Sequence, residues 1–128
     1  MIRTSQEIET YLPPLTKSLN LEGEPKWVLL RFLINISLSI DSSQPTPPET
    51  TSGEGREYRL EQITGEGKGV EDVTKFYWDA IEAYDSIVVT SKKELEDRLQ
   101  QHIFRGFYTL KTSLKQNSNI FEWLVQEF

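Results

Sequence analysis

The residue types that carry chemistry in proteins are few in this chain of 128 residues. The sequence contains one histidine, His102, and no cysteine. A thiolate nucleophile, a thiolate metal site and a paired-histidine metal site are therefore excluded. An unperturbed imidazole titrates at about pH 6.5, so His102 could act as a general acid or base. Because no nucleophile or metal cluster is recognisable near it, we favour a non-catalytic His102 that hydrogen-bonds a neighbouring helix or a phosphate, and we assign no catalytic residue.

Two further patterns have both a functional and a structural interpretation. Asp72, Asp79 and Glu82 could in principle hold a divalent cation, but they fit a solvated helix face better, so we predict no metal ion and no other cofactor. Three glycines at two-residue spacing, in residues 64–69, suggest a phosphate-binding loop. Their spacing differs from GxxxxGK[ST] and no strongly apolar strand precedes them, so we predict a turn.

Basic side chains are the strongest candidates for a binding surface. The net charge is −6, and residues 41–85 hold eleven acidic side chains against four basic ones. Residues 98–119 contain basic side chains and no acidic ones. Affinity for DNA comes from counterion release at each phosphate contact, so one cationic helix face is compatible with an acidic protein. A plain solvated face is the alternative. The predicted DNA-binding residues are Lys92, Lys93, Arg98, Arg105, Lys111 and Lys115.

Arg31 is a separate candidate. It lies in the stretch 27–40, where nearly every position is apolar, and it shares one helix face with Asn35 and Ser39. A buried arginine is costly unless it is paired. We therefore interpret Arg31 either as a structural ion-pair partner, which we favour, or as a phosphate contact.

Helices must position these residues, because apolar side chains recur at three- and four-residue intervals through most of the chain. The pattern predicts a mostly α, compact single domain over residues 1–128, with four to five helices. The helix of residues 27–40, opened by Pro25, should be its buried centre. A long helix should begin after Ser91, and Gly106 midway along it indicates that a neighbouring element packs closely there.

The other predicted elements are shorter. A capping box with Thr4 as N-cap predicts a first helix, in which two prolines at positions 13–14 should cause a kink or a new helix start. Residues 70–84 predict a third helix and residues 120–128 a last one. Residues 41–57 are rich in Ser, Thr, Pro, Gly and Glu and predict a mobile loop.

The hydropathy pattern bears on location. No stretch approaches the length of about 18 apolar residues that a membrane span requires. The N-terminal residues also lack the basic segment and the small-residue cleavage site of a signal peptide. We therefore expect no membrane association and a cytoplasmic protein.

Three strings in this sequence resemble the DndE family, the small E component of bacterial and archaeal DNA phosphorothioation systems. The apolar helix of residues 28–38, which carries an arginine and ends in Ser-Leu, is similar to an apolar helix of the family. Residues 57–66 are similar to its Glu-aromatic stretch followed by a Gly-Glu turn. The most specific string is His-Ile-Phe-Arg-Gly at residues 102–106, which is similar to its His-x-x-Arg-Gly signature. Their order and spacing agree over roughly residues 1–115, and the family is α-rich.

This resemblance implies a role in replacing a non-bridging phosphate oxygen of DNA by sulfur. In such systems a desulfurase mobilises sulfur, an iron–sulfur protein with an ATP-pyrophosphatase-like domain transfers it, and an ATPase of the structural-maintenance type assists. The E component resembles a DNA-engaging accessory that is linked with nicked duplex DNA and with homo-oligomers. The implied partners are therefore double-stranded or nicked DNA, the iron–sulfur component, the ATPase component and further copies of the chain. A chain without cysteine or a nucleotide-binding loop agrees with a subunit that does not itself transfer sulfur.

The leading interpretation is a non-catalytic, DNA-binding and scaffolding subunit of a phosphorothioation complex. One alternative is a weak DNA-nicking enzyme centred on His102 and acidic residues. Another is a protein-only adaptor whose acidic middle segment faces basic partners. A ribbon-helix-helix regulator would need an alternating basic strand, and residues 1–4 are too short to establish one.

Overall fold

The computed structural model describes residues 1–40 and 55–116, with side chains as far as residue 113. Within these residues there are five α-helices, one short 3-10 helix and one pair of two-residue strands. The prediction of a mostly α domain of four to five helices is confirmed. The predicted last helix over 120–128, and all but the end of the predicted loop over 41–57, lie outside the described residues.

Helix α2 (Lys26–Ser39) is the centre of the fold, as predicted, and it packs mainly along α5 (Lys92–Gln116). Its buried side chains are almost all aliphatic, and it begins directly after Pro25. Gly106 of α5 lies against the α2 backbone, so closely that a Cβ added there would stand 1.9 Å from the carbonyl oxygen of Leu33. The close packing that Gly106 predicted is therefore present, and only a residue without a side chain fits.

Helix α1 (Gln6–Ser18) begins one residue later than the capping box predicted. Its N-cap is Ser5, whose hydroxyl accepts a hydrogen bond from the amide of Ile8 at 3.2 Å, and Thr4 instead bonds across to Arg56. The prolines at 13–14 start no new helix, and both are exposed. Because they lie on the solvent side, the opposite face still packs into the core and α1 continues through them.

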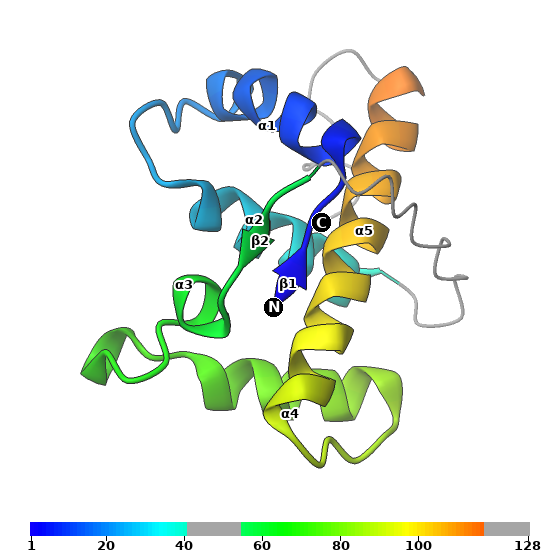
Figure 1. Ribbon diagram of the computed structural model, residues 1–128. Helices are drawn as coiled ribbons and strands as arrows, with labels where there is room; N and C mark the ends of the chain where they lie inside the picture. Colours follow the sequence, from blue (N-terminus) through cyan, green and yellow to red (C-terminus); the bar gives the residue numbers. More distant parts are fainter. Residues whose placement is uncertain (41–54, 117–128) are drawn as a thin grey trace.

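A small sheet crosses the front of α2, and the sequence did not predict it. Strand β1 (Ile2–Arg3) pairs antiparallel with β2 (Glu57–Tyr58), and Ile2 faces Tyr58 in register. Figure 1 shows the two strands lying between α1, α2 and α5. The amide of Arg3 also donates to the side chain of Gln100 on α5 at 2.8 Å. The strands are too short to carry a period-two hydropathy pattern, which explains why the sequence did not reveal them.

Helix α3 (Leu60–Thr64) follows β2 and was also not predicted. It ends at Gly65, which has a left-handed φ of 73°; an added Cβ there would lie 2.5 Å from the carbonyl oxygen of Glu71. The glycine-rich segment is therefore a turn, as predicted, followed by the 3-10 helix η1 (Gly69–Glu71).

Helix α4 (Thr74–Asp85) begins four residues later than the sequence indicated. Val70, which was expected on its apolar face, is fully exposed. The amide of Val73 donates to the carbonyl oxygen of Thr64 at 2.8 Å, so the chain before α4 is held against α3 and does not continue the helix.

Helix α5 runs past the other elements, from α4 at one end to α1 at the other (Figure 1). Ser91 caps it as predicted, accepting a hydrogen bond from the amide of Glu94 at 3.1 Å. Its apolar residues at three- and four-residue intervals, Leu95, Leu99, Ile103, Phe107 and Leu110, are all buried. No helix in the described part of the chain is long and apolar enough to cross a membrane.

Candidate functional site

His102 stands in a buried cluster that ties three helices together. Its side chain is 3% exposed, with Nδ1 2.7 Å from the Ser37 hydroxyl of α2 and Nε2 3.2 Å from both carboxylate oxygens of Asp85 at the end of α4. The ring also meets the edge of Tyr84, with centroids 5.4 Å apart. A carboxylate only accepts, so a neutral His102 donates from Nε2 and its Nδ1 accepts from Ser37.

This cluster has the residue types of a catalytic triad without the accessibility of one. Ser37 is completely buried, so no substrate reaches its hydroxyl in this arrangement. Burial lowers the pKa of His102 below its ordinary value, and the positive charges of Arg105 and Arg98 add to this, although Asp85 acts in the opposite direction. A largely neutral imidazole follows at pH 7. These contacts favour a non-catalytic His102, which stays a prediction.

Of the lysines predicted to bind DNA, the three with described side chains reach the surface, and each is paired with an acid. Lys92 bonds Glu66 of the glycine turn (residues 65–69), Lys93 bonds Asp97 of its own helix at 2.9 Å, and Lys111 bonds Glu7 of α1. The acidic partners raise the pKa of all three ammonium groups, so the groups are fully charged at neutral pH. The expected cationic face is thus divided into separate ion pairs.

The two arginines of α5 lie on one side of the helix, as their spacing of seven predicted, but that side faces α4. Arg98 is 3.6 Å from Asp85 and is one third exposed. Arg105 is 5% exposed, and its guanidinium lies over the ring of Tyr84 at 5.2 Å. The sequence predicted Arg105 on a phosphate-facing surface, but in the structure packing against α4 covers it. The side chain of Lys115 lies outside the described residues.

Arg31 lines a cavity of about 340 Å³ between α2, α3 and the glycine turn. Its Nε donates to the carbonyl oxygen of Ile63 at 2.5 Å, and its guanidinium lies 4.4 Å from the ring centre of Trp27. No ion pair involves Arg31 among the residues that the structure describes. Arg31 was predicted to be either a structural ion-pair partner or a phosphate contact. The described residues give it a structural hydrogen bond but no ion-pair partner.

The glycine turn, whose spacing differs from that of phosphate loops, contributes a cation to this cavity. Lys68 comes from the glycine turn and lines the same space as Arg31. The sequence did not associate the two residues, which are far apart along the chain. The only signal was a lysine inside a run of glycines, and that pattern does not show which helix the turn approaches.

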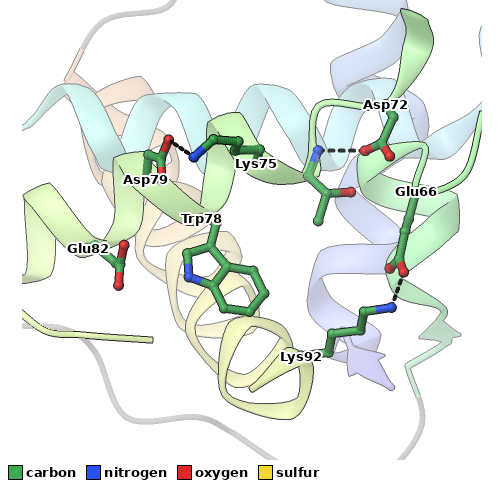
Figure 2. Close-up of a pocket in the computed structure, with 8 residues that line it drawn as sticks. Glu66, Asp72, Lys75, Trp78, Asp79, Glu82 and Lys92 are labelled. Atoms are coloured by element: carbon green, nitrogen blue, oxygen red, sulfur yellow. Dashed lines mark hydrogen bonds and ion pairs between the residues drawn. The ribbon is translucent and has the colours of Figure 1, made fainter. Parts of the chain in front are cut away.

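A second cavity, of about 510 Å³, lies between α4, the glycine turn and the start of α5. Figure 2 shows Trp78 pointing into it, with Asp79 and Glu82 on one side and Lys92 on the other. Four acidic and two basic side chains line it: Glu66, Asp72, Asp79, Glu82, Lys75 and Lys92. This cavity therefore disfavours phosphate.

Asp72, Asp79 and Glu82, the acidic residues that could hold a divalent cation, have partners of their own. The side chain and amide of Thr74, together with the amide of Gly67, hold the pKa of the Asp72 carboxyl below its ordinary value, and Asp79 is bonded to Lys75 at 2.9 Å. Glu82 accepts from the amide of Val89. The described residues contain no group of three or more His, Cys, Asp or Glu placed to share a metal ion.

Comparison with models of protein families identifies the family of this chain. A family model described as DNA sulphur modification protein DndE matches residues 1–118. Searches of curated proteins and of solved structures give no match. The matched region covers every described element and contains the histidine, arginine and glycine at residues 102–106 that carried the resemblance in the sequence. This chain therefore belongs to the DndE family of DNA sulphur modification proteins.

Proposed function

We propose that this protein is a DNA-binding accessory and scaffolding subunit of a DNA sulfur modification complex, and that it engages duplex or nicked DNA directly. Its family implies the role in DNA sulfur modification. The observation that supports direct DNA contact is the state of Lys93 and Lys111 on α5. Both are charged, both reach the surface, and each is held by a single carboxylate.

Such ion pairs are replaceable. Exposed pairs contribute little to stability because water and salt screen them. A DNA phosphate can take the place of the carboxylate and gain the counterion release that drives DNA binding. Lys92 is a weaker candidate because it lines the acidic cavity, and the burial of Arg105 removes it from direct phosphate contact in this arrangement. Affinity per chain should therefore be modest and sensitive to salt.

The test is DNA affinity measured against salt concentration, with intact and nicked duplex. The double variant Lys93→Gln/Lys111→Gln should weaken binding and reduce the magnitude of the log–log salt slope by about 1.8, because each phosphate contact contributes about 0.9. The matched control is Arg56→Gln/Lys75→Gln, which removes two exposed positive charges elsewhere. Equal effects of the two double variants would show that α5 is not the contact surface. No binding at low salt would exclude direct DNA contact.

A protein-only adaptor is the second candidate, and the acidic cavity beside Trp78 favours it. An adaptor of this kind would bind basic partner proteins and show no affinity for DNA at any salt concentration. For DNA nicking, the geometry offers little support because His102 and Ser37 are buried. We expect supercoiled plasmid to stay intact with added divalent metal; if nicking occurs, His102→Ala should abolish it.

The partners that we propose follow from the family's role in DNA sulfur modification. They are the iron–sulfur and ATPase components of the modification system, together with further copies of this chain. An oligomer would repeat the α5 lysines, so that avidity compensates for weak single contacts. The proposed compartment is the cytoplasm, where the DNA lies.

A further inference from the structure

The guanidinium of Arg31, which lines the cavity of about 340 Å³, is held in one position by the fold. Helix α2 fixes the Arg31 backbone in the core, the Ile63 carbonyl oxygen holds Nε at 2.5 Å, and the Trp27 ring covers one face of the guanidinium. Nε donates to that carbonyl oxygen, and no hydrogen bond within the described part of the chain uses the two terminal nitrogens. A guanidinium fixed in this way loses little entropy when it binds an anion.

The charges around the cavity are compatible with a bound anion. Two cations line it, Arg31 and Lys68, and two acids, Glu61 and Glu71. Glu61 is already paired with Arg59 at 3.2 Å. Neither Lys68 nor Glu71 has an ion-pair partner among the described residues, and both are exposed. Arg31 and Lys68 therefore oppose one acidic group that is not already neutralised.

The remaining lining suits the organic part of a ligand. Trp27 and Val73 supply apolar surface, and Gln62 supplies an amide, although its oxygen already accepts from the Arg59 amide. A volume of about 340 Å³ is at the lower end of the range of about 300–1,000 Å³ for small-ligand pockets. A cavity that combines a fixed arginine, a lysine and an aromatic ring has the chemistry that recognises a nucleotide.

We propose that this cavity binds a nucleotide through its terminal phosphate, with Arg31 as the fixed fork, Lys68 as the second cation and Trp27 as the wall for the sugar or base. The inference rests on the proposed DNA-binding function and deepens it, because it adds a subsite for a strand end to the sequence-independent contacts of α5. A strand end can enter a concave cavity, whereas an internal duplex phosphate is flanked on both sides by its own strand. The same chemistry would accept a free nucleotide.

Short single-stranded oligonucleotides with a 5′-phosphate, a 3′-phosphate or two hydroxyl ends, and a free deoxynucleoside monophosphate, are the probes. Binding is measured by calorimetry with the full chain. We expect at least one phosphorylated end to bind about tenfold tighter than the hydroxyl-ended strand, because a charge-assisted contact is worth roughly one decade in affinity. Equal affinity for all three strands, together with no binding of the mononucleotide, would overturn the proposal.

Variants separate the residues involved. Lys68→Gln should remove most of the preference for the phosphorylated end, and Arg31→Lys should abolish it, while Glu71→Gln should increase it by about threefold because an opposing charge is lost. The control is Lys75→Gln, which removes an exposed lysine from the acidic cavity. Arg31→Lys also breaks the bond to Ile63, so the exposed Lys68 and Glu71 carry the decision. An unchanged preference in both of those variants would overturn the proposal.

The outcome is distinguishable from failure of the proposed function. Salt-dependent duplex binding that depends on Lys93 and Lys111, without any preference for a phosphorylated end, would reject this subsite and leave the proposed function intact. Binding of the mononucleotide without any duplex binding would confirm the subsite and reject direct duplex binding. An effect of Lys68→Gln on internal duplex affinity alone would assign Lys68 to the general surface and reject the subsite.

Discussion

Gly106 illustrates how a single residue determines the distance between two helices. It lies midway along α5, where helix propensity alone would favour alanine by about 1 kcal/mol. The α2 backbone occupies the place of its side chain, since an added Cβ would lie 1.9 Å from the Leu33 carbonyl oxygen. Packing outweighs propensity at this position, and the helices meet backbone to backbone.

We therefore expect Gly106→Ala to lower the free energy of unfolding by about 2–4 kcal/mol, because α2 and α5 must separate to admit a methyl group. Urea unfolding measures the change. Thr112→Ala, at an exposed position of the same helix, is the control and should be neutral or slightly stabilising. A Gly106→Ala variant that matched the parent in stability would mean that the two helices are less closely packed than described.

His102 predicts a pH dependence of stability. Burial holds its pKa below the value of about 6.5 in the unfolded chain, so the unfolded state binds more protons as the pH falls. The contribution is complete above pH 6.5 or so and is lost progressively at lower pH. The groups that face the ring are Asp85, Ser37, Tyr84, Arg98 and Arg105.

The protein has one histidine, so a single NMR signal reports this titration. We expect its midpoint below the ordinary value for histidine. Urea unfolding should show lower stability at pH 5.5 than at pH 7.5, and His102→Gln, which keeps a donor toward Asp85, should be less dependent on pH in this window. A midpoint above 6.5 would show that Asp85 outweighs burial.

At the scale of elements, the sequence predicted the long, regular helices and missed the short pieces. The buried positions of α2 and α5 recur often enough to show a helical period. Elements of two to five residues, such as β1, β2 and α3, complete too little of any period to be recognised. The late start of α4 has another cause, because the hydrogen bond from Val73 to Thr64 is a tertiary contact.

The ion pair between α1 and α5 leads to a prediction about DNA affinity. Glu7 of α1 neutralises Lys111, so Glu7→Gln should strengthen DNA binding by about two- to threefold at low salt. Glu22→Gln is the matched control, since it removes one exposed negative charge from the loop after α1. Equal gains in both variants, measured by the same salt titration, would show that only net charge matters.

At the scale of the whole molecule, the charge pattern of the sequence is only partly preserved in space. Four acidic side chains of the middle segment, Glu66, Asp72, Asp79 and Glu82, gather around the cavity beside Trp78. As far as the side chains of α5 are described, its basic residues do not form one cationic face, because acids from α1, α4 and the glycine turn meet them. Which acid meets which base depends on tertiary packing, and no local pattern encodes it.

The same limit applies to the candidate sites. The sequence singled out His102 and Arg31 by residue type, but not Ser37 and Asp85, which contact His102, or Lys68, which lines the same cavity as Arg31. Those residues come from other helices and turns, at distances along the chain that one sequence does not reveal. Family membership, by contrast, was readable from short strings.

The pairing of α2 with α5 also sets an order of events during synthesis. Helix α2 is the most apolar element, and it leaves the ribosome well before residues 92–116, which form its main partner. The face that packs on α5 stays uncovered until almost the whole described chain has been made. Contacts so distant along the chain slow folding relative to bundles of neighbouring helices. The nascent chain should therefore expose an apolar, aggregation-prone helix face for most of its translation time.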